Sequence, residues 1–405
     1  MTPRPIAPRW GCLWVIAVAL GWTPVATADD LGAAPVDAWP TARGTAAGTG
    51  RSATTLTLPL AEAWQQTFDK TAFAAVPVIA ADTIYLGDLD GTFRALALDT
   101  GATRWEYKAE AAGFPSAAAL PPDAAPTVVV VGDDTGVVRA FDTATGTVRW
   151  EYATQAEISG GPTIIRDAAG DRVLVGSRDA SLSCLSLADG GVVWKHSIAD
   201  QIRCSPTVAA TADGLRVFLA GCDGKLHVLD AVTGAEVGAV TIDGPTGTTP
   251  AAADGRVFFG TEGGGFFAID FLAPDVAWRI QPAAGGQSYR SSAALTADAA
   301  IVGSRGKAVE AFARTDGSRL WKQPLRGRVD ASPVVVAAAE RGQPPKETVV
   351  VADSAGTVLL LDANSGEVAW EFAAGGRFDG GAAVAAGRVV IASAAGTVWC
   401  FGGPP

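Results

Sequence analysis

The chain has 405 residues and a formal net charge of −11, from 31 Lys and Arg against 42 Asp and Glu. This acidic balance argues against nucleic acid or an anionic membrane as a partner, because both are bound by basic surfaces. The 48 Gly and 24 Pro, beside only 18% charged residues, indicate many short strands joined by tight turns and therefore an all-β chain.

The N-terminus has the pattern of a secretory signal over residues 1–28. Arg4 and Arg9 supply its positive region, residues 12–22 its apolar stretch, and Ala26-Thr27-Ala28 a small-residue cleavage site. We therefore expect export across the inner membrane to the periplasm or cell envelope, with a retained N-terminal anchor as the alternative. No later run is long and apolar enough to span a membrane, so the cleaved chain should have no transmembrane segment.

Residues 29–60 are rich in Ala, Gly, Thr and Pro. They offer little apolar surface to bury, which predicts a flexible leader ahead of the folded region.

A repeat begins after this leader. The segment from Ile84 to Trp105 is echoed six times along the chain, and its Trp recurs 45 residues later at Trp150 and 44 residues after that at Trp194. Each unit contains short apolar runs, an acidic Gly-containing bend and a final run that carries the Trp. A period of about 40 to 50 residues is typical of β-propeller blades, each an antiparallel sheet of four strands.

The two ends of the chain decide how the ring closes. The last unit, residues 382–401, supplies only three strands, and the missing strand is found in residues 61–68, whose Trp64 lies 41 residues before Trp105. An N-terminal strand that completes the last blade predicts a monomeric, eight-bladed β-propeller over residues 61–402, because a closed ring hides its edge strands. Seven blades or an open ring are the alternatives.

The D-x-T-G-x-x-x-W element at Asp99–Trp105, found again with variations at Asp142–Trp150 and Asp362–Trp370, resembles the tryptophan-docking repeat of quinoprotein (pyrroloquinoline-quinone, PQQ) dehydrogenases and of BamB-type outer-membrane assembly factors. The likeness covers about residues 39–402. Each Trp should pack against the neighbouring blade and give its indole N–H to a carbonyl. The tryptophans expected to dock in this way are Trp64, Trp105, Trp150, Trp194, Trp278, Trp321 and Trp370.

Two departures from the repeat stand out. Blade four has no docking Trp, and we assign Val237 to the position where the Trp would stand. Blade five has Ala273-Pro274 where a turn Gly is expected. They predict weakened docking contacts or a remodelled loop.

The resemblance leaves an enzyme and a binding protein as alternatives. A quinoprotein dehydrogenase implies adjacent cysteines, a calcium ion held by carboxylate and amide oxygens, and an Asp base. The sequence has no adjacent cysteines, and we expect its histidines, His196 and His227, to be solvated or core-edge residues instead of metal ligands. We therefore predict a non-enzymatic protein-binding platform without cofactor or metal, with a BamB-like role in outer-membrane protein assembly as the nearest analogy.

The candidate partner site is a funnel at the start of the innermost strands, where the blades differ from one another. Arginines and a tyrosine grouped on one side of a funnel are typical anchors for a protein or an anionic ligand. The alternative is pairing of these arginines with acids of neighbouring blades. The candidate residues are Arg203, Tyr289, Arg290, Arg328, Asp330, Arg377 and Asp379.

Two cysteines, Cys204 and Cys222, should face each other near the open end of the first hairpin of blade four. An oxidising compartment would allow them to form a disulfide, with buried free thiols as the alternative.

Overall fold

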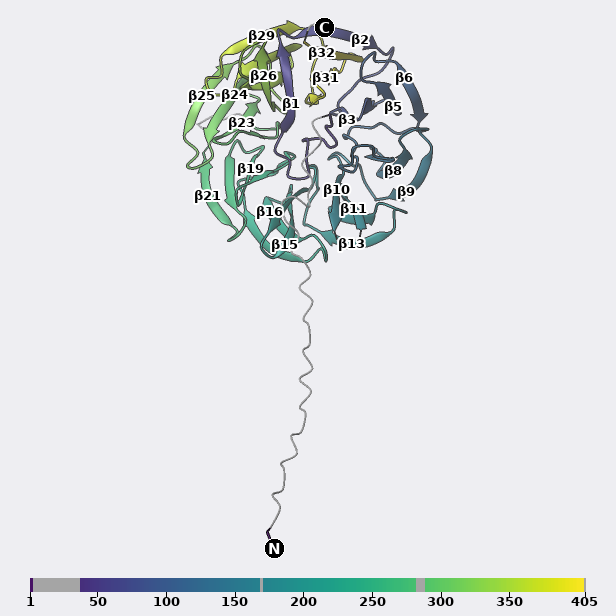
Figure 1. Cartoon of the computed structure of the whole chain (residues 1–405), viewed down its shortest axis with the longest axis vertical. Coiled ribbons are helices and arrows are strands. Elements are labelled where there is room, and N and C mark those ends of the chain that lie inside the picture. Colours follow the sequence, from purple (N-terminus) through teal and green to yellow (C-terminus); the bar gives the residue numbers. More distant parts are fainter. Residues whose placement is uncertain (3–36, 168–169, 282–287, 404–405) are drawn as a thin grey trace.

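The computed structural model describes residues 1–2, 37–167, 170–281 and 288–403. They form eight small sheets arranged as a ring (Figure 1), which confirms the predicted eight-bladed β-propeller. The predicted signal lies outside the described residues, apart from residues 1 and 2. Within the described ranges, no helix is both long enough and apolar enough to cross a membrane.

The strands follow the chain blade by blade. Blade one contains β3 (Val78–Ala80), β4 (Thr83–Gly87), β5 (Thr92–Ala97) and β6 (Thr103–Lys108); blade two β7 (Val128–Gly132), β8 (Val137–Asp142) and β9 (Val148–Ala153); blade three β10 (Thr163–Asp167), β11 (Gly170–Gly176), β12 (Ser181–Ser186) and β13 (Val192–Ser197); blade four β14 (Thr207–Thr211), β15 (Gly214–Ala220), β16 (Lys225–Asp230) and β17 (Glu236–Thr241). Blade five contains β18 (Ala251–Ala253), β19 (Arg256–Gly260), β20 (Phe266–Asp270) and β21 (Asp275–Ile280); blade six β22 (Ala294–Leu295), β23 (Ala299–Ser304), β24 (Ala308–Ala313) and β25 (Arg319–Pro324); blade seven β26 (Val334–Glu340), β27 (Lys346–Ala352), β28 (Thr357–Asp362) and β29 (Val368–Ala373), joined by β1 (Arg51–Leu58); blade eight β30 (Ala383–Ala385), β31 (Arg388–Ala392), β32 (Thr397–Gly402) and β2 (Ala61–Thr67). In blade two an isolated bridge between Ala119 and Val130 takes the innermost position.

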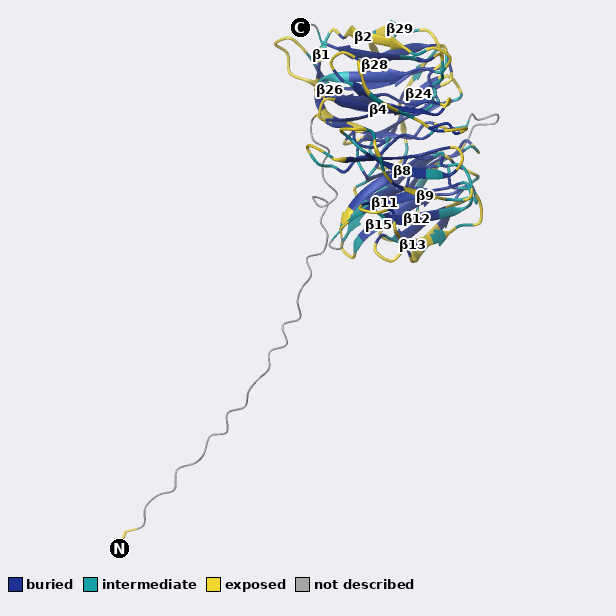
Figure 2. Cartoon of the chain, turned by 90° about the vertical axis from the view of Figure 1, so that its right-hand side faces the viewer, coloured by how far each residue is buried: buried dark blue, intermediate teal, exposed yellow. Residues whose placement is uncertain are grey.

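Burial explains the composition of the strands. The inner strands of each blade are covered on both faces by neighbouring blades, so β7 is an uninterrupted, fully buried VVVVG run. The outermost strands alternate, as in β6, whose residues are exposed or half-buried in turn. Figure 2 shows the buried strands inside the ring and the exposed loops at its edges. The core is therefore the set of contacts between blades.

The ring closes as the sequence predicts. β2 pairs antiparallel with β32, with Gln65 opposite Trp399 and Thr67 opposite Thr397. The first strand after the N-terminal segment thus completes the last blade, and blade eight presents no unpaired outer edge on β32.

The N-terminal segment does not form the predicted flexible leader over its described part, residues 37–60. β1 runs parallel to β26 and adds a fifth strand to blade seven, near the centre of the ring (Figure 1). Before it, the segment exchanges two backbone hydrogen bonds between Trp39 and Ile79 of blade one. Its carbonyls then accept from the innermost strands of further blades, at the pairs Pro40–Leu120, Ala46–Val208, Ala47–Ala252, Thr49–Leu295 and Gly50–Val335.

The prediction failed because it looked for apolar side chains. The segment is held by its backbone, which pairs with strand-edge N–H groups that would otherwise lack partners inside the protein. Its small residues allow this close approach: a Cβ at Gly48, whose φ is +66°, would lie 2.7 Å from the carbonyl oxygen of Pro250. With Ser52, whose hydroxyl donates to the Val384 carbonyl at 2.7 Å, the segment bonds to seven of the eight blades.

Seven tryptophans join consecutive blades by the same contact. Each indole N–H donates to a carbonyl of the next blade over 2.8–3.1 Å, at the pairs Trp64–Leu98, Trp105–Thr143, Trp150–Leu187, Trp194–Ala231, Trp278–Arg314, Trp321–Ala363 and Trp370–Leu60. Six of the seven indole rings, all but that of Trp370, also lie against a turn glycine. At Gly146 the φ is +71° and a Cβ would lie 2.7 Å from the Trp105 ring, so the turn requires glycine for conformation and for space.

The seam between blades four and five is built differently. The strand register pairs Val228 with Gly238, in the position that holds the Trp in other blades, so the departure lies at Gly238 and not at the exposed Val237. The turn position of blade five holds Pro274, whose Cγ lies 2.9 Å from where a Cβ on Gly238 would be. The two departures therefore form one exchange: Trp becomes Gly, and the facing Gly becomes Pro.

Candidate functional site

A cavity of about 190 Å³ lies where all eight blades converge. Each blade lines it with two alternate residues of the lead-in, the short segment that precedes the innermost strand. The first residues of these pairs are Ala74, Pro115, Ser159, Arg203, Gly247, Arg290, Asp330 and Asp379; the second are Val76, Ala117, Gly161, Ser205, Thr249, Ser292, Ser332 and Gly381. The second set is small and repeats around the ring, whereas the first set differs in charge from blade to blade.

Arg43 of the N-terminal segment lines the same cavity. It is buried, and its Nη2 donates to the carbonyls of Ala293 at 2.7 Å and Pro333 at 2.9 Å. Burial lowers the pKa of this guanidinium, because the charged form loses its hydration inside the protein. Arg43 thus ties the segment to blades six and seven.

The lead-ins begin at the opening of the cavity. We call this opening the mouth, and its predicted arginines are Arg203, Arg290, Arg328 and Arg377. Most of them are paired with acids. Arg203 and Arg290 share the carboxylate of Glu262, at 3.8 and 3.4 Å, and Arg377 pairs with Asp379 at 2.7 Å. Pairing with an acid of a neighbouring blade, which the sequence left open as the alternative, is therefore present for Arg203 and Arg290, whereas Arg377 pairs within its own lead-in. The side chains of Arg290 and Arg377 are 48% and 56% exposed, so these pairs contribute little to stability.

Arg328 and Asp330 have separate surroundings. Asp330 lines the cavity and is held by Arg305, with Nε 3.0 Å from Oδ1. Arg328 is exposed, and its backbone N–H donates to the Ser354 hydroxyl at 2.8 Å. Within the described part of the chain, its guanidinium makes no ion pair, so it is the open cation of the mouth.

Tyr289 does not belong to the funnel, and its prediction as an anchor is wrong. It is buried against Phe266, with ring centroids 5.7 Å apart, and its hydroxyl donates to Glu310 at 3.4 Å. Burial raises the pKa of this phenol. Tyr289 directly precedes Arg290 in an extended lead-in, so the two side chains point to opposite sides, and Phe114 and Val329 fill the same core position in other blades.

The sequence reasoning missed five residues of the mouth. Arg178 pairs with Glu157 at 2.8 Å, and Arg305 and Glu262 hold predicted residues in place. Asp134, Arg178, Glu262 and Arg305 share one position, the second residue of the bend between the second and third strands. The first residue of that bend caps the turn, as when Asp88 accepts the Thr92 N–H at 2.8 Å. A search for the bend position that varies would have found these four.

The cysteines are free in the structure, so the predicted Cys204–Cys222 disulfide is not formed. The Cys204 thiol donates to the Ala220 carbonyl at 3.3 Å, and the Cys222 thiol to the Thr246 carbonyl at 3.6 Å. Burial raises the pKa of the Cys204 thiol to about 12. The structure thus has the alternative that the sequence left open, buried free thiols.

The two histidines lie at the edge of the core, as expected, with His227 buried and His196 half-buried, but they also lie close to each other. His196 of blade three and His227 of blade four lie with ring centroids 6.2 Å apart, and Glu236 lies beside both. They are distant in the sequence, but β13 and β16 face each other across the seam between the two blades.

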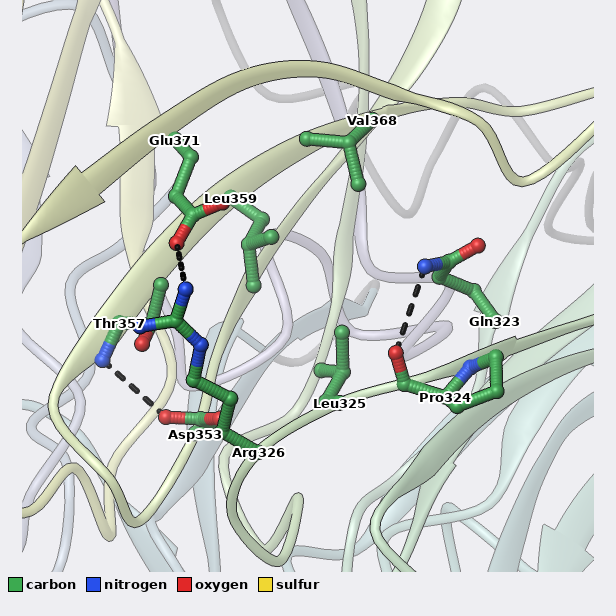
Figure 3. A pocket seen from close by; sticks show the side chains of 9 residues that line it. All are labelled: Gln323, Pro324, Leu325, Arg326, Asp353, Thr357, Leu359, Val368 and Glu371. Atoms are coloured by element: carbon green, nitrogen blue, oxygen red, sulfur yellow. Dashed lines mark hydrogen bonds and ion pairs between the residues drawn. The ribbon is translucent and has the colours of Figure 1, made fainter.

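A larger hollow of about 290 Å³ lies at the seam between blades six and seven (Figure 3). Leu359 and Val368 supply its apolar walls, and Arg326 reaches Glu371 at 3.5 Å across one side. The hollow opens at the outer surface, away from the residues that converge on the ring axis.

The donors of the central cavity do not fit the quinone and calcium ion of the dehydrogenases. Its two carboxylates, Asp330 and Asp379, are already held by Arg305 and Arg377. The cavity volume is also below the roughly 300 to 1,000 Å³ of sites for larger organic ligands. The four described cysteines are buried and none is adjacent to another. We derive no redox step for this site.

Comparisons with known proteins agree with the fold. A family model described as outer membrane protein assembly factor BamB matches residues 61–178, 178–337 and 305–402. The solved structure of BamB from Moraxella catarrhalis is similar at 21% identity, covering 85% of this chain and 100% of that chain with a TM-score of 0.66. No curated protein sequence matches the chain.

Solved dehydrogenases are similar in fold as well. Quinohemoprotein alcohol dehydrogenase from Comamonas testosteroni has 14% identity and a TM-score of 0.73, covering 94% of this chain and 83% of that chain. A europium-containing methanol dehydrogenase has 12% identity and a TM-score of 0.68, covering 91% of this chain and 98% of that chain. At such identities the likeness establishes the propeller and carries no chemistry over to this chain.

Proposed function

The chain belongs to the BamB family of β-propellers, and from this premise we propose that it is a non-enzymatic protein-binding platform of the cell envelope. In this proposal the signal at residues 1–28 exports the chain, and the ring then takes part in outer-membrane protein assembly, the role named in the description of the family. The partner binds at the mouth of the central cavity.

The charge of the mouth is the observation that carries this proposal. Five carboxylates face six arginines there, an excess of one positive charge in a chain whose net charge is −11. A local excess of positive charge on an acidic protein favours an acidic segment of a partner and orients its approach. The six arginines are Arg178, Arg203, Arg290, Arg305, Arg328 and Arg377, and the five acids are Asp134, Glu157, Glu262, Asp330 and Asp379.

The ion pairs of the mouth arginines are compatible with the binding of a partner. Arg203 and Arg290 share one carboxylate at 3.8 and 3.4 Å, so neither is fully neutralised. Exposed pairs of this kind exchange partners at little cost, so a carboxylate from a bound protein can replace Glu262. Arg328 is available without any exchange.

The test is complementation of a strain that lacks the gene. We expect the wild-type chain to restore the level of outer-membrane β-barrel proteins, and the double variant Arg290→Ala, Arg328→Ala to fail while remaining folded. The matched control is Arg104→Ala with Arg166→Ala, because these arginines are also exposed but lie in pairs away from the mouth. Cross-linking from the mouth, followed by mass spectrometry, should identify the same partner for the wild type and for the control.

Two results would overturn the proposal. One is full complementation by the Arg290→Ala, Arg328→Ala variant with its cross-links unchanged. The other is a visible-absorbance complex of the purified chain with pyrroloquinoline quinone and calcium, together with alcohol-dependent dye reduction, which would establish the dehydrogenase alternative.

A further inference from the structure

The seam between blades three and four brings together the only two histidines of the chain. Glu236 Oε2 lies 2.6 Å from His227 Nδ1 and 3.6 Å from His196 Nε2. The donor atoms of the three residues all lie within 4.8 Å of one another. Two imidazoles and a carboxylate from three strands of two blades thus converge on one point.

The propeller repeat does not require this cluster. The same two positions meet at other seams, where Arg139 lies 5.7 Å from the Tyr107 ring and Tyr152 contacts Ser183 at 3.1 Å. At the seam between blades six and seven they are Gln323 and Leu359, drawn in Figure 3. At those seams the two residues contact each other only by packing or by a single hydrogen bond. The histidines are therefore a local feature of one seam and need their own explanation.

His227 is in an unusual electrostatic position. It is buried, with Nδ1 facing Glu236 at 2.6 Å and Nε2 facing Asp223 at 3.0 Å. Without a metal, the ring can donate to both carboxylates only when both nitrogens carry a proton. The Asp223 side chain is only 4% exposed, and its Oδ1 has no hydrogen-bond partner among the described residues.

A metal ion on Nδ1 would resolve this arrangement. The neutral ring would keep its one proton on Nε2 and donate a hydrogen bond to Asp223, and Glu236 would become a ligand instead of a hydrogen-bond acceptor. A carboxylate behind a ligating histidine is the usual way in which proteins fix the tautomer and orientation of the ring.

We propose that His196, His227 and Glu236 bind a divalent transition metal, with Zn²⁺ as the ion to test, and that Asp223 orients His227. Two imidazoles and one carboxylate are a ligand set that Zn²⁺ accepts, with a water molecule in the fourth position. Glu236 is 39% exposed, so water and an ion can reach the cluster from solvent. The ion joins β13 of blade three to β16 and β17 of blade four.

The test is titration of the purified, chelator-treated chain with Zn²⁺ by calorimetry. We expect one ion per chain. At a free Zn²⁺ concentration of 100 times Kd, the Tm should rise by about 3 °C, since the ion binds only the folded ring. Replacing Zn²⁺ with Co²⁺ should give the visible bands of tetrahedral cobalt, which report the ligand set directly.

His196→Ala is the informative variant. His196 is partly exposed, and Glu236 at 3.6 Å is its only ion-pair contact within the described ranges, so its loss should leave the fold intact. We expect Zn²⁺ affinity to fall at least about tenfold. Lys195→Ala is the matched control, because Lys195 neighbours His196 on β13 and pairs with Ser183 within its own blade. His227→Gln, which retains hydrogen-bonding capacity, should lose the cobalt bands.

The proposal is overturned if the chain takes up no stoichiometric Zn²⁺, or if His196→Ala binds it as tightly as Lys195→Ala does. Cobalt bands that persist in His227→Gln would have the same meaning. None of these results bears on the binding mouth, which lies at the ring axis.

Discussion

Seven seams of the propeller are closed by a Trp against a turn, and the seam between blades four and five is closed by Gly238 against Pro274. In most Trp seams the large ring requires a glycine opposite, whereas Gly238 leaves room that a proline fills. What the repeat preserves is thus a pair of complementary shapes, and a missing Trp is no measure of weakness until the residue facing it is known. Pro274 stays exposed, and the buried apolar contact across this seam is made by Phe271, whose ring centroid lies 4.8 Å from that of Phe218.

The largest effect is expected at a Trp seam. Trp321→Ala removes a buried ring and an indole hydrogen bond to Ala363 of 2.9 Å, and should lower the free energy of unfolding by about 3–5 kcal/mol. Denaturant unfolding followed by far-UV circular dichroism measures it. The control is Leu320→Ala, because Leu320 is the exposed neighbour on the same strand and should change stability by less than about 0.5 kcal/mol. Equal losses for both variants would contradict the docking role.

The seams also separate what the sequence could predict from what it could not. The spacing of Trp64, Trp105 and Trp150 determines the blades and their closure, because every blade repeats the same strand order. Within a lead-in, the residue types differ from blade to blade, so the sequence does not show which residue points to the core and which to the cavity. Tyr289 and Arg290 therefore looked equivalent, although Tyr289 is buried and Arg290 lines the cavity.

Contacts between consecutive blades were the hardest to foresee. His196 and His227 meet only because the residue two places after a docking Trp faces the third strand of the next blade. The N-terminal segment was missed for another reason. It buries Trp39, Leu56 and Leu60 in the core, but it reaches most blades through its backbone carbonyls, a capacity that every residue has.

The N-terminal segment is a third kind of connection between blades, beside the Trp seams and the Gly238–Pro274 seam. Among its described residues 37–60, Arg43 is the one buried charged side chain. Arg43→Ala leaves the buried carbonyls of Ala293 and Pro333 without this donor and should cost about 2–3 kcal/mol of unfolding free energy. Arg51→Ala on the same segment is the control, because its pair with Glu347 is half-exposed and should contribute less than about 1 kcal/mol. If both variants unfold at the same urea concentration, Arg43 does not hold the segment.

The unusual seam can be tested by rebuilding it. Gly238→Trp places a ring against Pro274 and should cost about 1–3 kcal/mol through overpacking. The double variant Gly238→Trp, Pro274→Gly recreates the partners of the other seams, so it should recover at least about 1 kcal/mol relative to Gly238→Trp alone. Thermal unfolding of the two single variants and the double variant measures this coupling. Additive losses would show that the exchange of Trp for Gly and of Gly for Pro is not complementary.

The smallest effect is expected for the thiols of blade four, which has the unusual seam on one side and the histidines on the other. A covalent Cys204–Cys222 bond would support this blade independently of its seams, whereas free thiols leave the seams alone to hold it. For the chain cleaved after Ala28, we expect four thiols per chain by a colorimetric count in denaturant without reductant. In the folded state none should react at neutral pH, because the four thiols are buried and burial raises the pKa of Cys184 to about 11 and of Cys204 and Cys400 to about 12. A count of two would mean that oxidation joins Cys204 to Cys222, so that a covalent bond supports blade four in addition to its seams.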